Sequence, residues 1–283
     1  MRTVRLGVLA LLCGLLAACA SGPIKVLPEK TYYTQAKQAL DSGNFKESIK
    51  NLEDLETYYP FGRYAEQAQL DLIYARYQNL DLEGARSAAE RFLRLHPQSP
   101  HADYALYMQG MASYNLDYSL AEQYFPIDVG ARDPGQQREA FRDFSQLLNR
   151  YPDSEYAADA RKRMEAIRNR LAQLELEAAR YYIKRQAYVA ASNRASYILE
   201  NYPHAPALEQ ALPILIETDR KLGMKDAADH AVSLLALNFP HSRWLDMNGH
   251  YVTHVIKPEN RSLLSVVTFG LLGDKKDDTQ NDQ

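Results

Sequence analysis

The stretch DSGNFKESIKNLEDLETYYP, residues 41–60, combines a glycine-containing turn, a short amphipathic segment and a proline stop. Ser48, Leu52 and Leu55 recur at offsets of 4 and 3, so a helix would place all three on one stripe. Pro60 cannot continue that helix, and it biases the residue before it out of the helical conformation. The stretch therefore predicts an amphipathic helix that follows the turn and ends just before the proline.

The same arrangement recurs along the chain. Short phrases ending in proline close five apolar-periodic segments: YYP (58–60), LHP (95–97), RYP (150–152), NYP (201–203) and NFP (238–240). The segments before the later prolines carry an equivalent stripe, made of Ala85, Ala89 and Phe92; Ala140, Phe144 and Leu147; Ala191, Ala195 and Ile198; and Ala228, Val232 and Leu235. Repetition of one helical unit is typical of repeat proteins, whose units stack because none buries its apolar face alone.

A second helical segment precedes each of these, and turns such as DSGNF (41–45) and KLGMK (221–225) join the two. The resulting helical hairpins resemble tetratricopeptide repeats. The family pattern is a small residue in the first helix, then Gly and an aromatic at the turn, then Ala, a large apolar residue and Pro. It is matched best by Ala36, Gly43, Phe45, Leu52 and Pro60, and the fourth unit matches through Ala179, Tyr182, Tyr188, Ala191 and Pro203. We therefore expect an all-α fold, a superhelical solenoid of about five tetratricopeptide-like helical hairpins.

The two middle intervals between the prolines are longer than the outer ones. The first contains 117–135, which we interpret as a loop because of its Pro and Gly residues, and the second contains 154–185, which predicts one long helix. The expected organisation is a signal peptide at 1–18, a lipidated linker at 19–28, repeats one to three at 29–152, the long helix with repeats four and five at 153–240, and a C-terminal extension at 241–283. Within that extension we expect a further helix after Pro240, an apolar stretch at 262–273 that is too short to span a bilayer, and a disordered end.

The first residues have the charged, apolar and small-residue order of a secretory signal. Its end, Leu16-Ala17-Ala18-Cys19, resembles the lipobox of bacterial lipoproteins. The resemblance implies cleavage before Cys19 and lipid attachment there, and two or three acyl chains anchor a protein stably. Because residue 20 is Ala rather than Asp, it also implies the inner leaflet of the outer membrane, facing the periplasm. Ala18-Cys19-Ala20 fits an ordinary signal peptidase as well, so simple secretion is the alternative.

The composition and the motifs of the chain give no indication of an enzyme. The formal net charge is −3 at pH 7, so nothing indicates a general affinity for nucleic acid. The chain contains no phosphate loop, dinucleotide fingerprint or nucleophile elbow. His250 and His254 lack the glutamate and third ligand of a zinc site, and the basic run at 161–170 is typical of a solvated helix face. We expect no catalytic residue, no cofactor and no metal.

Binding is the better expectation for a helical-repeat protein. In the tetratricopeptide family, the first helices of successive hairpins line a concave groove. The resemblance places these residues of the present chain in that groove: Tyr33, Tyr74, Tyr77, Tyr107, Met111 and Tyr114. Tyrosine combines a large apolar ring with a polar tip, which suits an extended peptide that ends in an aromatic residue. The alternative is that these tyrosines only pack between hairpins.

A lipobox followed by SGNFKESIKNLEDLETYYPFGRYAEQAQLDLIYARY (42–77) resembles the lipoproteins of the outer-membrane β-barrel assembly machinery. The resemblance implies a non-catalytic scaffold that binds a BamA-like barrel protein, other lipoproteins of the machinery and unfolded outer-membrane proteins, and that helps insert β-barrels. The alternative is a tetratricopeptide lipoprotein that coordinates enzymes of peptidoglycan synthesis or cleavage.

Arg194, in the sequence ASNRAS (191–196), is the residue predicted to bind the barrel protein. It lies one position off the apolar stripe between Ala191 and Ala195, so its side chain reaches the rim of the packed face. A guanidinium is planar and suits a bidentate carboxylate on a partner. We therefore expect repeats four and five to hold the barrel protein, separated from the substrate groove by the long helix.

Overall fold

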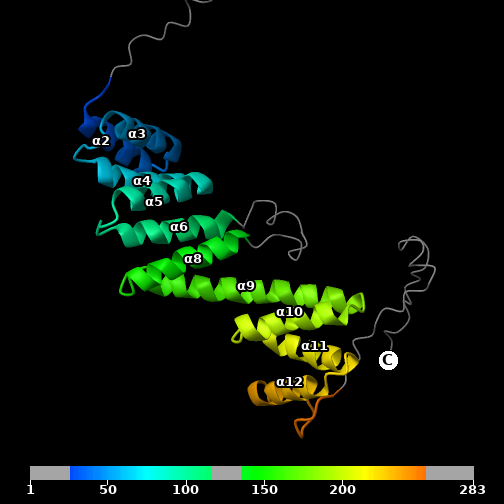
Figure 1. The fold of residues 1–283 in the computed structure, drawn as a ribbon. Coiled ribbons are helices and arrows are strands. Elements are labelled where there is room, and N and C mark those ends of the chain that lie inside the picture. The colour runs from blue at the N-terminus through cyan, green and yellow to red at the C-terminus, as the bar shows by residue number, and fades with distance from the viewer. Residues whose placement is uncertain (1–25, 117–134, 253–283) are drawn as a thin grey trace, which may run out of the picture. The chain divides into compact units, whose positions relative to one another are not determined.

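The computed structural model describes residues 26–116 and 135–252, and these are helical apart from turns and a single antiparallel bridge between Leu245 and Tyr251 (Figure 1). The helices are α2 (Glu29–Asp41), α3 (Phe45–Tyr58), α4 (Ala65–Gln78), α5 (Leu82–Leu95), α6 (Ala102–Leu116), α8 (Gly135–Arg150), α9 (Ala157–Lys184), α10 (Tyr188–Asn201), α11 (Ala207–Lys221) and α12 (Lys225–Asn238). The predicted all-α class is confirmed. Within the described ranges, none of the helices has the length and apolar character that a membrane span needs.

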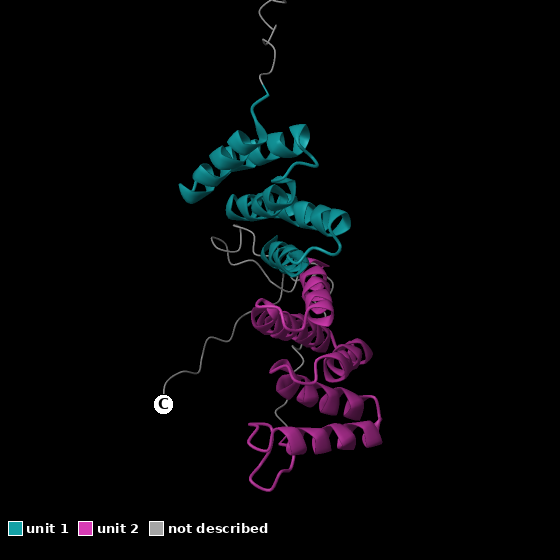
Figure 2. Ribbon diagram, turned by 90° about the vertical axis from the view of Figure 1, so that its left-hand side faces the viewer, with its two compact units in different colours: residues 1–116 teal, residues 117–283 magenta. Residues whose placement is uncertain are grey.

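The chain divides into two compact units, residues 1–116 and 117–283 (Figure 2). In the first unit each helix from α2 to α6 packs on the next one along the chain. In the second, α8 packs on α9, α9 on α10, α10 on α11 and α11 on α12, and α9 also contacts α11. Each unit is thus a stack of antiparallel helical pairs, as the predicted solenoid requires. The division falls inside the third repeat, since α6 and α8 belong to different units, and the boundary at 152/153 stays a prediction.

In the four hairpins whose turns the structure describes, those of repeats one, two, four and five, the turn depends on one residue with a left-handed backbone. Gly43 and Gly223 occupy this position with φ of 74° and 75°, and Leu80 and Gln186 occupy it with φ of 61° and 59°. Only glycine adopts this conformation without steric cost. The next helix begins two residues later in every case, so this residue sets where the second helix of the hairpin starts.

The predicted proline stops are confirmed. Helices α3, α5, α8, α10 and α12 each end two residues before the proline of their repeat. The residue between, such as Tyr59 or Phe239, has left the helical conformation, with φ of −134° and ψ of 55° or 63°, and its N–H still donates to the carbonyl four residues earlier. A following proline disfavours the helical conformation for this residue, so the stop is a local property of the sequence.

The predicted stripe forms the cores of both units. All of its members are buried except Val232, which is partly buried against the C-terminal core. Phe92 and Phe144 are the largest side chains that are fully buried. The long helix is also confirmed, as α9, and it buries Ile167, Leu171, Ala172, Leu176, Ala179 and Ile183 along its length.

The prediction of a helix after Pro240 was wrong for the residues that the structure describes. Asp246 instead accepts hydrogen bonds from the backbone N–H groups of Asn248 and His250, both at 2.8 Å. Such a side chain competes with helical hydrogen bonding, and Gly249 completes the turn with a φ of 79°. The turn brings Tyr251 back against α11, where its hydroxyl donates to Glu217 at 3.0 Å. The predicted signal peptide, the extension beyond Val252 and the predicted loop at 117–135, apart from Gly135 at the start of α8, lie outside the described residues.

Candidate functional site

The six predicted groove residues lie on the first helices of the first three repeats, α2, α4 and α6. Tyr33 is on α2, Tyr74 and Tyr77 are on α4, and Tyr107, Met111 and Tyr114 are on α6. All three helices belong to the N-terminal unit, and α4 contacts α6 directly. The arrangement places five of the six residues on two adjoining helices, while their role in binding stays a prediction.

Tyr33 belongs to a polar cluster that joins α2 to α4. Its ring stacks on Tyr64 with centroids 4.7 Å apart, and the buried carboxylate of Asp71 lies near its hydroxyl. Gln67 Nε2 donates to Asp71 at 3.0 Å, and Lys37 Nζ lies 3.6 Å from the other carboxylate oxygen. Burial, followed by the charge of Asp71, raises the pKa of Tyr33 to about 12. Tyr33 is therefore held in place by its own chain.

Asp71 was not among the residues predicted for this surface. Its only signal is a charged residue within the otherwise apolar run QLDLIYA (69–75). A buried carboxylate is costly unless it is paired or hydrogen-bonded. The partners of Asp71 come from two helices, so they are brought together only by the fold.

Tyr77 and Tyr107 are partly buried and pack against the core formed by α4, α5 and α6. The Tyr77 hydroxyl accepts a hydrogen bond from Asn115 Nδ2 at 2.5 Å, which ties α4 to the end of α6. Met111 is 9% exposed, and Tyr114 is partly exposed. Met111 is therefore buried between helices, and the rings of Tyr77 and Tyr107 are partly buried there, as the alternative of packing between hairpins expects.

Tyr74 differs from the other groove residues because its side chain faces solvent. It is 41% exposed, which makes it one of the more exposed large apolar residues of the described chain. The residues around it on α4, Ile73 and Ala75, are fully buried, so the helix is rigidly packed beneath the ring. An exposed aromatic ring on a rigid element contributes contact area at little conformational cost. Tyr74 is the groove residue best placed to meet a ligand.

Arg194 is exposed on α10, but its guanidinium is already paired within the chain. Its Nη1 donates to Glu175 Oε2 on α9 at 2.8 Å, with 47% of the arginine side chain and 15% of the glutamate side chain exposed. This hydrogen bond and the glutamate charge raise the pKa of Arg194 above its ordinary value. The pair fixes the direction of the arginine, and its remaining N–H groups stay available for a second carboxylate.

The remaining predicted residues give no further site. Cys19 and His254 lie outside the described residues. His250 is exposed, with Nδ1 3.2 Å from Asp246 Oδ2, and the N–H of His250 lowers the pKa of that carboxyl. Across residues 26–116 and 135–252, no three His, Cys, Asp or Glu side chains are grouped as metal ligands.

A family model described as "YfiO: Outer membrane lipoprotein" matches residues 26–234. The chain belongs to the YfiO family. Among its relatives, the outer membrane protein assembly factor BamD of Vibrio cholerae is 43% identical over 234 residues, covering 82% of this chain and 96% of that relative. BamD of Neisseria meningitidis serogroup A is 40% identical over 228 residues, with coverages of 81% and 83%. The resemblance drawn from residues 42–77 is therefore confirmed.

Among solved structures, a tetratricopeptide repeat protein from Parabacteroides merdae aligns with 76% of this chain and 68% of its own, at 15% identity and a TM-score of 0.35. The YfiO match begins at the first described residue and ends within α12, at residue 234. It therefore includes the helices that carry Tyr74 and Arg194, whereas residues 241–283 lie beyond it.

Proposed function

We propose that this YfiO-family chain is a non-catalytic scaffold of the β-barrel assembly machinery, which helps β-barrel proteins assemble in and insert into the outer membrane. The observation that carries the proposal is the 43% identity to an outer membrane protein assembly factor across 96% of that relative's length. The stacked hairpins support it, because helical-repeat proteins present extended surfaces on which several partners bind.

Substrate binding is assigned to the first helices of the N-terminal unit. Tyr74 offers an exposed ring, and Tyr77, Met111 and Tyr114 lie on the adjoining helices α4 and α6. An extended strand that ends in an aromatic residue would stack on such rings. The bound segment belongs to an unfolded outer-membrane protein, whose terminal strand is not yet paired in a barrel.

Barrel-protein binding is assigned to repeats four and five in the second unit, with Arg194 as the contact residue. Glu175 holds the guanidinium in one orientation at 2.8 Å, so little side-chain entropy is lost when a partner carboxylate binds. The partner is a BamA-like barrel protein, and other lipoproteins of the machinery bind the same scaffold. Because the substrate surface lies in the other unit, the two partners do not compete for one patch.

Cys19 attaches the chain to the inner leaflet of the outer membrane, facing the periplasm. Between Cys19 and the first described helix lie the nine residues 20–28, which span at most about 30 Å when extended. The tether therefore keeps α2 close to the membrane surface. Mass spectrometry of the N-terminal peptide tests this: we expect a lipid-modified peptide that begins at Cys19, and an unmodified peptide that begins at Ser21 contradicts it.

Reconstitution tests the scaffold function itself. Lipid vesicles that contain the barrel protein of the machinery are mixed with an unfolded barrel substrate, with and without this chain. We expect folding, followed by the heat-modifiable mobility of the barrel on gels, to depend on the chain. Equal folding in its absence contradicts the proposal and favours the alternative, a lipoprotein that coordinates peptidoglycan synthesis or cleavage enzymes.

A further inference from the structure

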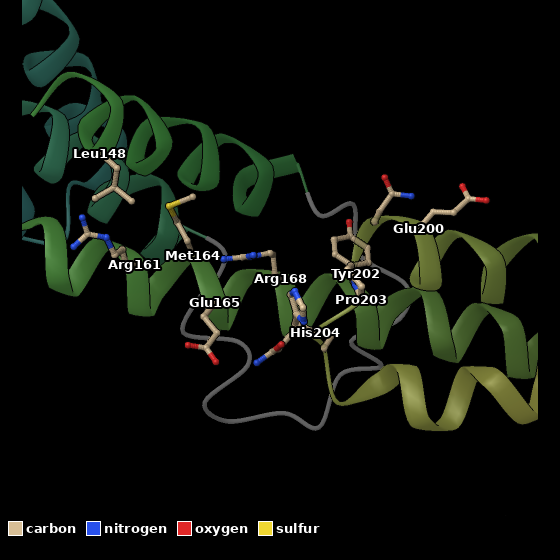
Figure 3. Close-up of a pocket in the computed structure, with 12 residues that line it drawn as sticks. Leu148, Arg161, Met164, Glu165, Arg168, Glu200, Tyr202, Pro203 and His204 are labelled. Carbon is tan, nitrogen blue, oxygen red and sulfur yellow. The ribbon is translucent and has the colours of Figure 1, made fainter. Parts of the chain in front are cut away.

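The second unit contains a cavity of about 670 Å³ that the predicted surfaces do not use (Figure 3). Its floor is the first half of α9, with Arg161, Met164 and Arg168, and its walls are Leu148 of α8 and the turn after α10, with Tyr202 and His204. It exists because α9 has 28 residues and α10 has 14, so the hairpin partner covers only part of the long helix.

The lining combines apolar surface with two arginines that have no carboxylate partner among the described residues. Neither Arg161 nor Arg168 forms an ion pair with any residue of the described ranges, whereas their neighbour Arg163 pairs with Asp159. Arg168 lies over the Phe141 ring, 5.9 Å from its centroid, and in Figure 3 it points into the space between Met164 and Tyr202. A ligand that fits has apolar side chains followed closely by carboxylates.

We propose that the occupant is the chain's own segment FGLLGDKKDD, residues 269–278. It carries Phe269, Leu271 and Leu272 directly before Asp274, Asp277 and Asp278, which is the order of groups that the cavity matches. The lysines in the segment match Glu165 and Glu200, which line the same cavity and have no cationic partner among the described residues. The segment therefore offers aspartates for the arginines of the cavity, lysines for its glutamates, and apolar side chains for its apolar lining.

The segment is also long enough to reach the cavity. Tyr251 contacts Glu217 and Arg220 near the end of α11, and Ala205, just before α11 begins, lines the cavity. The two points are separated by about the length of α11, roughly 20 Å. A random-coil linker of 17 residues, the separation of Val252 from Phe269, is expected to have a root-mean-square span of about 23 Å. A tether that matches the distance gives an effective concentration of order millimolar, which favours docking within one molecule.

Photocrosslinking in the full-length lipoprotein tests the proposal. A photoreactive amino acid replaces the exposed His204, and crosslinked peptides are identified by mass spectrometry after trypsin digestion. We expect a crosslink to the peptide 262–275, and none from the same group placed at Tyr181, which is 51% exposed on the distal part of α9. Mixing labelled and unlabelled protein shows whether the crosslink forms within one chain.

Charge reversal shows whether the arginines hold the segment. Arg161→Glu with Arg168→Glu should reduce the crosslink about tenfold, and Asp277→Lys with Asp278→Lys should do the same without touching the folded unit. Combining the two pairs should restore it. The proposal is overturned if no crosslink to 262–275 forms, if it forms only between chains, if position 204 captures a different protein instead, or if charge reversal leaves it unchanged.

Discussion

Replacing Gln186 with glycine should stabilise the second unit. Gln186 has φ of 59° in the turn between α9 and α10, whereas Gly223 has φ of 75° in the equivalent turn between α11 and α12. A left-handed backbone costs a residue with a Cβ about 1–2 kcal/mol, and glycine loses about 0.5–1 kcal/mol through the entropy of the unfolded chain. The Gln186 side chain is exposed, so little packing is lost. The net gain is about 0.5–1 kcal/mol.

The reverse substitution, Gly223→Ala, should destabilise the same unit by about 1 kcal/mol. A Cβ at Gly223 would meet nothing within 4 Å, so the loss comes from the backbone conformation alone and not from a clash. Gln186→Ala is the matched control, because it shortens an exposed side chain and leaves the left-handed strain in place.

Thermal unfolding of the mature chain, followed by circular dichroism, measures all three variants. For a domain of this size about 1 kcal/mol shifts Tm by roughly 2–4 °C. We expect Tm to rise by about 2 °C for Gln186→Gly, to fall by about 3 °C for Gly223→Ala, and to change little for Gln186→Ala. A lower Tm for Gln186→Gly, or an unchanged Tm for Gly223→Ala, would refute the assignment of these turns.

Three further predictions concern the candidate surfaces. Tyr74→Ala should weaken crosslinking to a peptide that ends in an aromatic residue by about five- to tenfold, while the similarly exposed Tyr181→Ala should not; equal losses would show that the groove is misplaced. Arg194→Glu should release the barrel protein in pull-downs, and adding Glu175→Arg should restore the internal ion pair but not the binding; rescue by the swap would make the role of Arg194 purely structural. Because burial and a neighbouring carboxylate raise the pKa of Tyr33 to about 12, the unfolded state deprotonates first and the free energy of unfolding should fall as pH rises from about 10 to 12. Tyr33→Phe should reduce that slope in urea titrations, and an unchanged slope would contradict it.

Helix ends were predictable because their causes are local. A proline removes an N–H and restricts the residue before it, so Pro60 and Pro240 mark the ends of α3 and α12 wherever those helices pack. The stripe was predictable because its spacing follows from the helical period. The segment after Pro240 was mispredicted because Asp246 satisfies backbone donors with its own side chain, a competition that apolar spacing does not reveal.

The polar contacts at the candidate surfaces depend on the tertiary fold. Asp71 meets Tyr33 only because α2 and α4 are brought together, and Glu175 meets Arg194 only because α9 and α10 form a hairpin. The cavity beside Arg168 depends on how far α9 extends past α10, which requires both helix bounds and the packing between them. Sequence periodicity shows which face of a helix is buried but not which charged groups meet across that face.

Purification of the tagged lipoprotein from detergent-solubilised outer membranes shows whether the chain acts as a scaffold of the β-barrel assembly machinery. Mass spectrometry of the proteins that remain bound identifies the main partner without assuming which surface binds it. We expect that partner to be a barrel protein with periplasmic repeats, retained by the wild-type chain and lost with Arg194→Glu. Recovery of a peptidoglycan synthase or hydrolase in its place, with no barrel protein, would contradict it.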